Sequence, residues 1–297
     1  MKKLQIILDT DIGDDIDDVW ALNLLLADPL FDVKLISVCY SDTDYKLQIV
    51  RDILERSNNG HIPLAAGTEK YNGGRTPHSY RFVSASPVKA PPSVEAIAKT
   101  VSGGAATDIV AIGPLTNVAE FVTAYPELKD KCRIIIMGGS VYRGYINQTA
   151  PCVEFNLECD AAAAVKVFTS DFKLIVAPLD VCRDFIIDGE YYQRIKNSDG
   201  AHAKIVIDYY TEWWIKYVGG AIKYDVNISG GILYDLLPVL YLSNPDEFLT
   251  EELPIVCDES GFLTVNSKGK RITALLKLKN KTKMYELVAD RLCKGEN

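Results

Sequence analysis

The sequence lacks the features of a membrane or disulfide-bonded protein. No apolar run approaches the roughly 18 residues of a membrane span. The apolar run at residues 4–8 stops at Asp9, before it reaches the length of a signal-peptide core. The seven cysteines are scattered, form no CxxC pair, and mostly lie in apolar stretches, as buried free thiols do. We therefore expect no disulfide framework and a cytoplasmic location.

Basic residues are too few for a nucleic-acid-binding surface. The chain has 32 Lys and Arg against 40 Asp and Glu, which gives a formal net charge of -8. Proteins that bind nucleic acids depend on clustered positive charge. The 48% of hydrophobic residues is ordinary for a globular chain, and 297 residues are enough to build a core without a structural metal. We expect neither nucleic acid nor a membrane as a partner.

Short apolar runs alternate with helical patterns over the first 180 residues. The runs are apolar throughout, which indicates strands buried on both faces of a sheet, and the helices between them predict a parallel sheet. Long loops, which are often functional, are predicted over residues 67–92 and 138–158. We predict strands at residues 4–8, 33–39, 62–66, 109–112, 133–137 and 174–177, and helices at residues 17–27, 45–56, 117–123 and 161–168.

The pattern changes in the last third of the chain. It becomes helical and aromatic after residue 185, then returns to short strands over 248–279 and ends in a helix over 283–292. We predict an α/β fold with an open, mostly parallel sheet flanked by helices, Rossmann-like, with helical and small β elaborations in the C-terminal third. No linker divides the chain, so we expect a single domain over 1–297. Ligands of such sheets bind beyond the carboxyl ends of the strands.

Six of the ten residues from 9 to 18 are carboxylates, and they follow the first predicted strand. Asp9 and Asp11 share one face of the strand because side chains alternate, and Gly13 permits a tight turn. The later acids are expected in the first turn of a helix, where the helix dipole favours negative charge. For Asp14 and Asp15, this helix-end role is as good an interpretation as a ligand role.

A helix end cannot balance the whole group of acids. It offers roughly half a charge, whereas converging carboxylates repel unless one is protonated or a cation intervenes. No Lys, Arg or His is interleaved among them. Oxygen ligands alone indicate Ca²⁺ or Mg²⁺ rather than zinc, and the spacing of an EF-hand is absent. We predict a hard-cation site completed by later segments, with the turn at 113–117 and Asp235, an acid among apolar residues, as candidates.

Four segments together resemble the inosine-uridine-preferring nucleoside hydrolase family. They keep the family's order and spacing as far as about residue 242. The resemblance implies an α/β fold that binds one Ca²⁺ and cleaves the N-glycosidic bond of ribonucleosides, in a homodimer or homotetramer. The matching segments are DTDIG at 9–13 with DDVWA at 17–21, AIGPLTN at 111–117, MGG at 137–139 followed by EFN at 154–156 and Asp160, and LYD at 233–235.

The resemblance also implies roles for individual residues. By it, Asp11 is the general base for the attacking water, and Tyr234 stands where one branch of the family has a His that protonates the leaving base. The implied cation ligands are Asp11, Asp18, the backbone carbonyl of Thr116, and Asp235. The implied substrate contacts are Asp17 at the ribose 2′-hydroxyl, Asp42 at the sugar, Glu154 and Asn156 at the 3′- and 5′-hydroxyls, and also Met137 and Asn147.

The expected chemistry suits these residue types. A leaving base takes electrons from C1′ and gives an oxocarbenium-like transition state, as in other glycoside cleavages. A bound cation lowers the pKa of coordinated water, and carboxylates around the ribose stabilise the developing positive charge.

The sequence departs from the family pattern in two places. Residues 14–16 lengthen the spacing between Gly13 and the pair of acids, so Asp15 competes with Asp18 as a ligand; we prefer Asp18, which keeps the spacing to the residues that follow. Tyr234 replaces the His, and a tyrosine, which ordinarily titrates near 10, is a poorer acid at neutral pH. Either the base leaves with other help or the substrate specificity differs.

Two other functions stay open at this point. A haloacid dehalogenase-like, Mg²⁺-dependent phosphatase would use Asp9 as nucleophile and Asp11 as acid, but the GPLTN and EFN segments would have no role in it. A non-catalytic, Ca²⁺-dependent ribose- or nucleoside-binding relative would have lost turnover through Tyr234.

Among the other aromatic and imidazole side chains, Trp214 and Tyr224 are candidates to stack on a base. His78, in the first long loop, is expected to be solvated.

Overall fold

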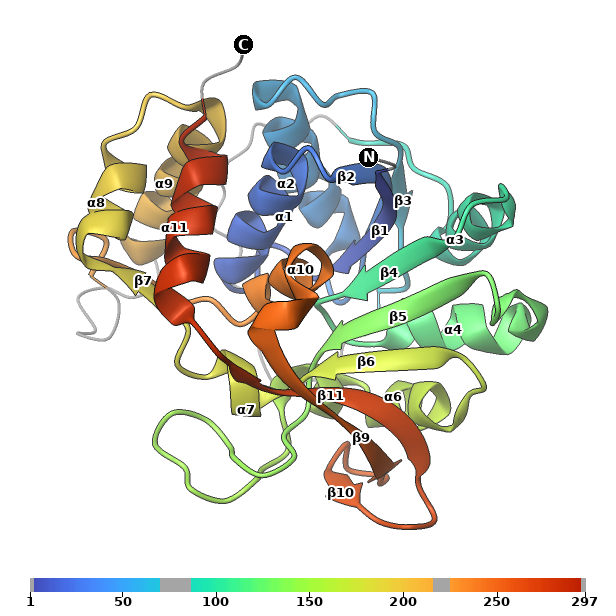
Figure 1. The fold of residues 1–297 in the computed structure, drawn as a ribbon. Helices are drawn as coiled ribbons and strands as arrows, with labels where there is room; N and C mark the ends of the chain where they lie inside the picture. Colours follow the sequence, from blue (N-terminus) through green and yellow to red (C-terminus); the bar gives the residue numbers. More distant parts are fainter. Residues whose placement is uncertain (1–2, 70–86, 216–224, 295–297) are drawn as a thin grey trace.

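A nine-stranded sheet forms the centre of the protein in the computed structural model, which describes residues 3–69, 87–215 and 225–294 (Figure 1). The strand order is β10-β9-β11-β6-β5-β4-β1-β2-β3, and all pairs from β11 through β6 to β3 are parallel. The predicted fold class is confirmed. The six predicted strands correspond to β1 (Leu4–Thr10), β2 (Phe31–Val38), β3 (Leu64–Ala66), β4 (Thr107–Ala111), β5 (Cys132–Met137) and β6 (Lys173–Ala177).

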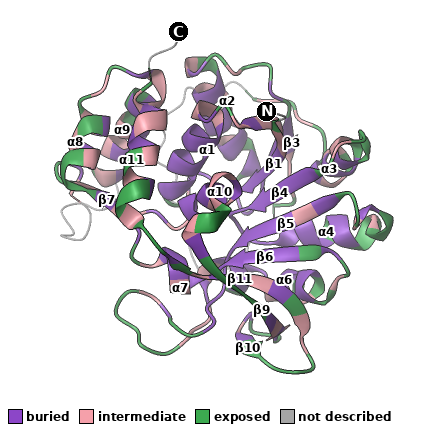
Figure 2. Cartoon of the chain, viewed as in Figure 1, coloured by how far each residue is buried: buried purple, intermediate pink, exposed green. Residues whose placement is uncertain are grey.

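Helices cover both faces of this sheet, as the apolar strands predicted. In β1, Ile6 and Leu8 contribute to one hydrophobic core, and Ile7 between them contributes to the other. Most residues of the central strands are buried (Figure 2). The first core is covered by α1 (Asp17–Ala27), α2 (Thr43–Arg56), α8 (Gly189–Lys196), α9 (Ala201–Trp213), α10 (Leu236–Ser243) and α11 (Lys281–Leu292), and the second by α3 (Ser93–Ser102), α4 (Thr116–Ala124) and α6 (Ala161–Thr169).

The C-terminal third extends the sheet. The strand β11 (Lys270–Leu278) runs parallel to β6 and antiparallel to β9 (Phe248–Cys257), which pairs in turn with β10 (Leu263–Val265). A separate antiparallel pair is formed by β7 (Ile186–Asp188) and β8 (Ser229–Ile232). The strands β9, β10 and β11 are the predicted small β elaborations, whereas β7 and β8 lie where the sequence predicted a helical segment.

The sequence patterns missed several short helices. The helix α3 was not predicted, because its ten residues directly follow a proline-rich stretch and its first residue is preceded by Pro92. Two helices of a single turn or little more, α5 (Phe155–Cys159) and α7 (Leu179–Cys182), are too short for a 3.6-residue pattern to develop. The same holds for the 3₁₀ turns η1 (Pro126–Leu128) and η3 (Pro245–Glu247). In the part of the chain that the structure describes, no helix is both long and apolar enough to cross a bilayer.

Candidate functional site

Three buried carboxylates from distant parts of the chain meet at the carboxyl end of β1. Asp17 and Asp18 open α1, and Asp235 directly precedes α10. Each offers an oxygen that lies within 4.8 Å of the other two. None of the three residues is more than 4% exposed, so water screens their mutual repulsion very little. We call Asp17, Asp18 and Asp235 the acidic triad.

Asp11 adjoins the acidic triad without belonging to it. It lies one residue beyond β1 and is 5% exposed. Burial raises the pKa of its carboxyl to about 8, against the pull of the Lys46 charge, and the nearby Asp14 raises that pKa further. The negative charge of Asp11 in turn raises the pKa of Asp18 and Asp235. Asp11 is therefore electrostatically part of the same site.

The chemistry of the acidic triad fits the predicted cation. Burial, followed by the charge of neighbouring acids, raises the pKa of all three carboxyls well above the ordinary range. A divalent cation would reverse this effect, because it favours the ionised form of each ligand. The donors are all oxygens, as Ca²⁺ and Mg²⁺ prefer. The residues present thus suit a hard divalent cation.

Two hydrogen bonds fix the orientation of the triad. The Thr10 hydroxyl donates to Oδ1 of Asp18, and the same hydroxyl oxygen accepts from the backbone N–H of Ile12 at 3.1 Å. The backbone N–H of Asp235 donates to Oδ2 of Asp17 at 3.3 Å. Thr10 was not among the predicted site residues. The sequence could have identified Thr10 from its position between Asp9 and Asp11. Strand alternation turns its side chain to the opposite face of the sheet from theirs, and α1 begins on that face.

The structure adds a cation that the local sequence does not show. Lys46, on α2, is 2% exposed, and its Nζ lies 2.9 Å from Oδ2 of Asp14 and 2.5 Å from the carbonyl oxygen of Asp11. Burial lowers the pKa of Lys46, but the charges of Asp14 and Asp11 outweigh this effect and raise it overall. The acids are therefore partly balanced by a lysine from another element, which corrects the expectation drawn from residues 9–18 alone.

The helix-end interpretation of Asp14 and Asp15 is wrong. The helix α1 begins only at Asp17, so these two residues lie in the turn before it. Asp14 pairs with Lys46, whereas Asp15 is exposed and accepts a hydrogen bond from the N–H of Ile16 at 2.7 Å. Asp18 is a member of the acidic triad and Asp15 is not.

The turn after β4 packs directly on Asp11. A Cβ at Gly113 would lie 2.8 Å from the backbone nitrogen of Asp11 and 2.9 Å from its Oδ1, so only glycine fits there without a shift of the backbone. Asn117 then donates from Nδ2 to Oδ1 of Asp9 at 2.8 Å. The hydroxyl of Thr116 donates to Asp160 at 2.7 Å, while the ligand atom predicted for Thr116 is its backbone carbonyl. The GPLTN turn and the acids thus share one edge of the sheet.

A second group of predicted residues meets at the carboxyl ends of β4 and β5. The Asn156 side chain donates from Nδ2 to the carbonyls of Ile112 and Met137, at 3.1 and 3.2 Å. Glu154 precedes α5 and accepts from the N–H groups of Asn156 and Gly139, at 2.9 and 3.0 Å. Burial nevertheless raises the pKa of Glu154 to about 7. The structure thus brings Met137, Glu154 and Asn156 together.

Two predicted sugar contacts lie on the surface. Asp42 is exposed and accepts from the N–H of Tyr45 at 3.0 Å, as a helix cap does. It follows Tyr40 and Ser41, two buried residues with φ of 64° and 61°, a strained conformation for residues other than glycine. Asn147 is exposed in the loop after β5. No hydrogen bond between described residues joins either side chain to the acidic triad.

Tyr234 is half-buried beside the triad, immediately before Asp235. Its ring packs edge-on against that of Tyr145, with the ring centroids 6.3 Å apart. Of the other candidates, Trp214 is half-buried and packs against the first core. His78 and Tyr224 lie outside the described residues.

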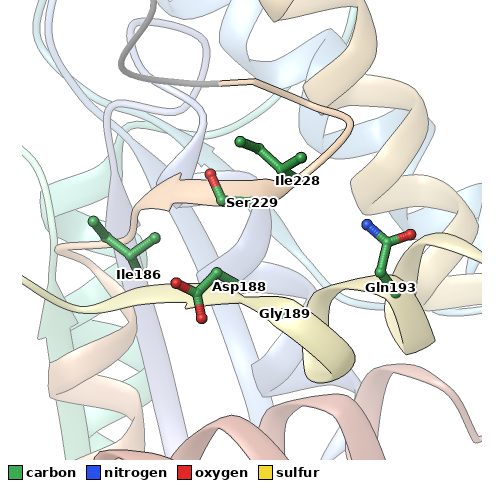
Figure 3. A pocket seen from close by; sticks show the side chains of 6 residues that line it. All are labelled: Ile186, Asp188, Gly189, Gln193, Ile228 and Ser229. Atoms are coloured by element: carbon green, nitrogen blue, oxygen red, sulfur yellow. The ribbon is translucent and has the colours of Figure 1, made fainter.

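A cavity of about 620 Å³ lies elsewhere, between β7, the start of α8 and β8 (Figure 3). Its lining contains one carboxylate, that of Asp188, and no predicted site residue. The cavity therefore lacks the converging acids of the candidate site. It is lined by Ile186, Asp188, Gly189, Gln193, Ile228 and Ser229.

The fold and the site together define an open, mostly parallel α/β protein with a carboxylate site beyond the carboxyl ends of its strands. The family model described as inosine-uridine preferring nucleoside hydrolase matches residues 6–290. The chain belongs to the inosine-uridine preferring nucleoside hydrolase family.

Individual relatives agree with this assignment. The chain is 32% identical over 288 residues to the pyrimidine-specific ribonucleoside hydrolase RihA of Escherichia coli, with 88% of this chain and 86% of the relative covered. It is 29% identical over 284 residues to the non-specific ribonucleoside hydrolase RihC of Klebsiella pneumoniae, with 89% and 87% covered.

Solved structures share the fold. A plant nucleoside hydrolase superposes with a TM-score of 0.83 at 18% identity, with 98% of this chain and 99% of the other covered. A purine-preferring ribonucleoside hydrolase from Gardnerella vaginalis gives a TM-score of 0.80 at 18% identity, with 97% and 98% covered.

Proposed function

We propose that this protein hydrolyses the N-glycosidic bond of ribonucleosides to the free base and ribose, with Ca²⁺ as the cation. The observation that carries the proposal is the acidic triad, which gathers three buried carboxylates from two distant segments in a chain of the nucleoside hydrolase family. Nothing in that arrangement is explained by packing, because three neighbouring buried acids oppose folding unless they are protonated or hold a cation.

In this proposal Asp11, Asp18, Asp235 and the carbonyl of Thr116 hold the cation. When bound, the cation makes a coordinated water more acidic and therefore a better nucleophile. Asp11 takes the proton of the attacking water. The buried carboxylates stabilise the positive charge that develops on the ribose ring as the base leaves.

The remaining residues bind and orient the nucleoside. Asp17 accepts a hydrogen bond from the ribose 2′-hydroxyl. Glu154 and Asn156, near the carboxyl ends of β4 and β5, accept from the 3′- and 5′-hydroxyls, Asn156 through Oδ1 because its Nδ2 already donates to the carbonyls of Ile112 and Met137. Tyr234, which directly precedes Asp235, lies on the side of the leaving base. Met137, Asn147 and Asp42 are proposed as further substrate contacts, the last two from the surface positions described above.

The test is a panel of purine and pyrimidine ribonucleosides assayed for free ribose, before and after removal of divalent cations. We expect release of ribose from at least one nucleoside, loss of activity after chelation, and recovery with added Ca²⁺. Activity that survives chelation would contradict the role of the cation.

Two outcomes of this panel would favour the other functions. Cation-dependent ribose or nucleoside binding without release of any base would support a non-catalytic binding relative. Hydrolysis of p-nitrophenyl phosphate, but of no p-nitrophenyl riboside, would support a phosphatase. We favour the hydrolase because the GPLTN and EFN segments contribute contacts at this edge of the sheet: Asn117 donates to Asp9, and Asn156 donates to the carbonyls of Ile112 and Met137.

The predicted homodimer or homotetramer and the cytoplasmic location stay predictions. Sedimentation of the purified protein gives the number of subunits directly.

A further inference from the structure

A short connection between β6 and β7 forms hydrogen bonds with the long loop after β5. The connection contains no predicted site residue. This connection consists of α7 and Arg183, which follows it. Asp180, on α7, accepts from the backbone N–H groups of Val141 and Tyr142 at 2.8 and 2.9 Å. The carboxylate therefore holds the first part of the loop.

Arg183 holds the second part of the same loop through backbone carbonyls. Its Nη1 donates to the carbonyls of Gly144, Tyr145 and Gln148 at 2.9, 3.3 and 2.7 Å, and its Nη2 donates to that of Ile146 at 3.3 Å. Hydrogen bonds from a charged donor are stronger than those between neutral groups. We call residues 141–148 the gripped loop; it is the light green loop beside α7 in Figure 1.

In the gripped loop, the side chain of Tyr145 reaches the candidate site. The hydroxyl oxygen of Tyr145 accepts from the backbone N–H of Phe155 at 3.0 Å, and Phe155 lies between Glu154 and Asn156. The ring of Tyr145 packs edge-on against Tyr234. Tyr145 thus joins the proposed ribose contacts to the proposed base side of the site.

We propose that Asp180 and Arg183 are positioning residues for substrate binding, and that they act through Tyr145. The proposal rests on the proposed function and deepens it. Loss of the grip lets the gripped loop move, so that Tyr145 no longer supports the Phe155 amide or the Tyr234 ring. The acidic triad comes from other segments, so the affinity for the cation stays the same. The expected substrate is a hydroxyl-rich sugar with an attached planar base, recognised across these two groups.

The first experiment compares Arg183→Met with Arg183→Lys and with Arg143→Met. Methionine keeps the apolar stem of Arg183 and removes the forked donor, and lysine keeps the charge but not the fork. Arg143 is an exposed residue of the same loop, so its replacement controls for lost charge. We expect kcat/KM for a hydrolysed nucleoside to fall about tenfold in Arg183→Met, mainly through KM, and less in Arg183→Lys. Arg143→Met should stay within twofold of the wild type.

Calcium affinity, measured by titration calorimetry, separates positioning from general damage. An unchanged affinity in Arg183→Met supports the proposal, whereas a parallel loss of calcium affinity overturns it. An unchanged kcat/KM in Arg183→Met also overturns it. If Arg183→Met does not fold, Asp180→Asn takes its place, because the amide keeps the shape of the carboxylate and loses one of its two acceptor oxygens.

A double-mutant cycle tests the route through Tyr145. In a Tyr145→Phe background, which lacks the hydroxyl acceptor, Arg183→Met should cost clearly less than it does in the wild type. If the losses in kcat/KM of the two single variants multiply fully in the double variant, Arg183 acts by another route.

Hydrogen exchange distinguishes failure of this proposal from failure of the proposed function. Arg183→Met should speed amide exchange at residues 141, 142 and 155, whether or not the protein is active. If the wild type hydrolyses no nucleoside, the proposed function fails while this test of the grip still gives a result. If these amides exchange at the wild-type rate, the grip is refuted, even in an active enzyme.

Discussion

The two halves of the candidate site are held in place by different means. The half made of Asp11 and the acidic triad lies at the ends of β1, α1 and α10, and every one of these acids is buried. The half around Tyr145 and Tyr234 is only half-buried, and its loop donates hydrogen bonds to Asp180 and accepts them from Arg183. The first half depends on the core of the protein, and the second on a few side chains.

This difference separates two kinds of function. Groups that handle a cation or a proton have to be placed accurately by rigid elements, because their effect falls off steeply with misplacement. A loop held by a few polar contacts can change more readily without damage to the core. Changes in the acidic half should therefore alter cation binding and kcat, and changes in the loop half should alter KM.

The largest effect is expected from Asp11→Ala. Loss of a general base lowers turnover by about two to four decades, and the alanine also removes one proposed cation ligand. Single-turnover assays at saturating Ca²⁺ give the loss in the chemical step. Near-normal turnover with an intact cation site would contradict the role of Asp11 and weaken the division into two halves.

Asp18→Asn is expected to lower calcium affinity by about 10- to 100-fold or more, since even groups that only orient a metal ligand have effects of this size. Asp15→Asn is the matched control, because Asp15 is exposed and lies outside the acidic triad. It should change the affinity by no more than a few-fold. Titration calorimetry with Ca²⁺ checks both variants, and the reverse order of effects would assign the ligand to Asp15.

Lys46→Met tests whether the acidic half depends on its buried lysine. Removal of one partner from a buried ion pair costs about 3 kcal/mol or more, because the other charge stays buried. Asp14 is 11% exposed, so we expect a loss in the free energy of unfolding of about 2 to 3 kcal/mol. Urea unfolding with and without Ca²⁺ measures it. A loss below 0.5 kcal/mol would show that water replaces the ammonium group.

The last test of the acidic half is a change of stability with pH, which needs no substitution. Burial raises the pKa of Asp11 from 3.8 to about 8 and that of Glu154 from 4.5 to about 7. Between about pH 4 and pH 8, the folded, cation-free protein therefore binds more protons than the unfolded chain. Its stability falls as the pH rises from about 4 to 8. Thermal unfolding in chelator should show a fall in Tm across this range. Added Ca²⁺ should remove most of the fall, and a rise of Tm with pH in chelator would contradict the pKa directions.

Much of the acidic half could be predicted from the sequence, because its signals are side chains. Two sequence features conflict with a buried environment unless a cation is bound: the run of acids at 9–18 after an apolar strand, and Asp235 among apolar residues. Lys46 was missed although it lies on the same helical stripe as Ile49, Val50 and Ile53, all buried on α2. A lysine at the start of a helix is ordinarily solvated, so the stripe alone did not identify it.

The loop half could not be predicted in the same way. Arg183 and Asp180 bind backbone carbonyl and N–H groups, which every residue of the loop has, so no pair of side chains in the sequence indicates the contact. The helix α3 was missed for a related reason, since the residues before it are rich in proline and resemble loop. What the sequence does not indicate is where the backbone of one segment meets a side chain of another.

Gly113 limits how the protein can be redesigned. The space between the turn after β4 and Asp11 admits a hydrogen atom and nothing larger, so any side chain at this position would shift the aspartate itself. Libraries that aim at new nucleosides should therefore leave the sheet edge unchanged. Sequence diversity belongs instead at positions of the gripped loop other than Tyr145, because no acid of the triad comes from that segment.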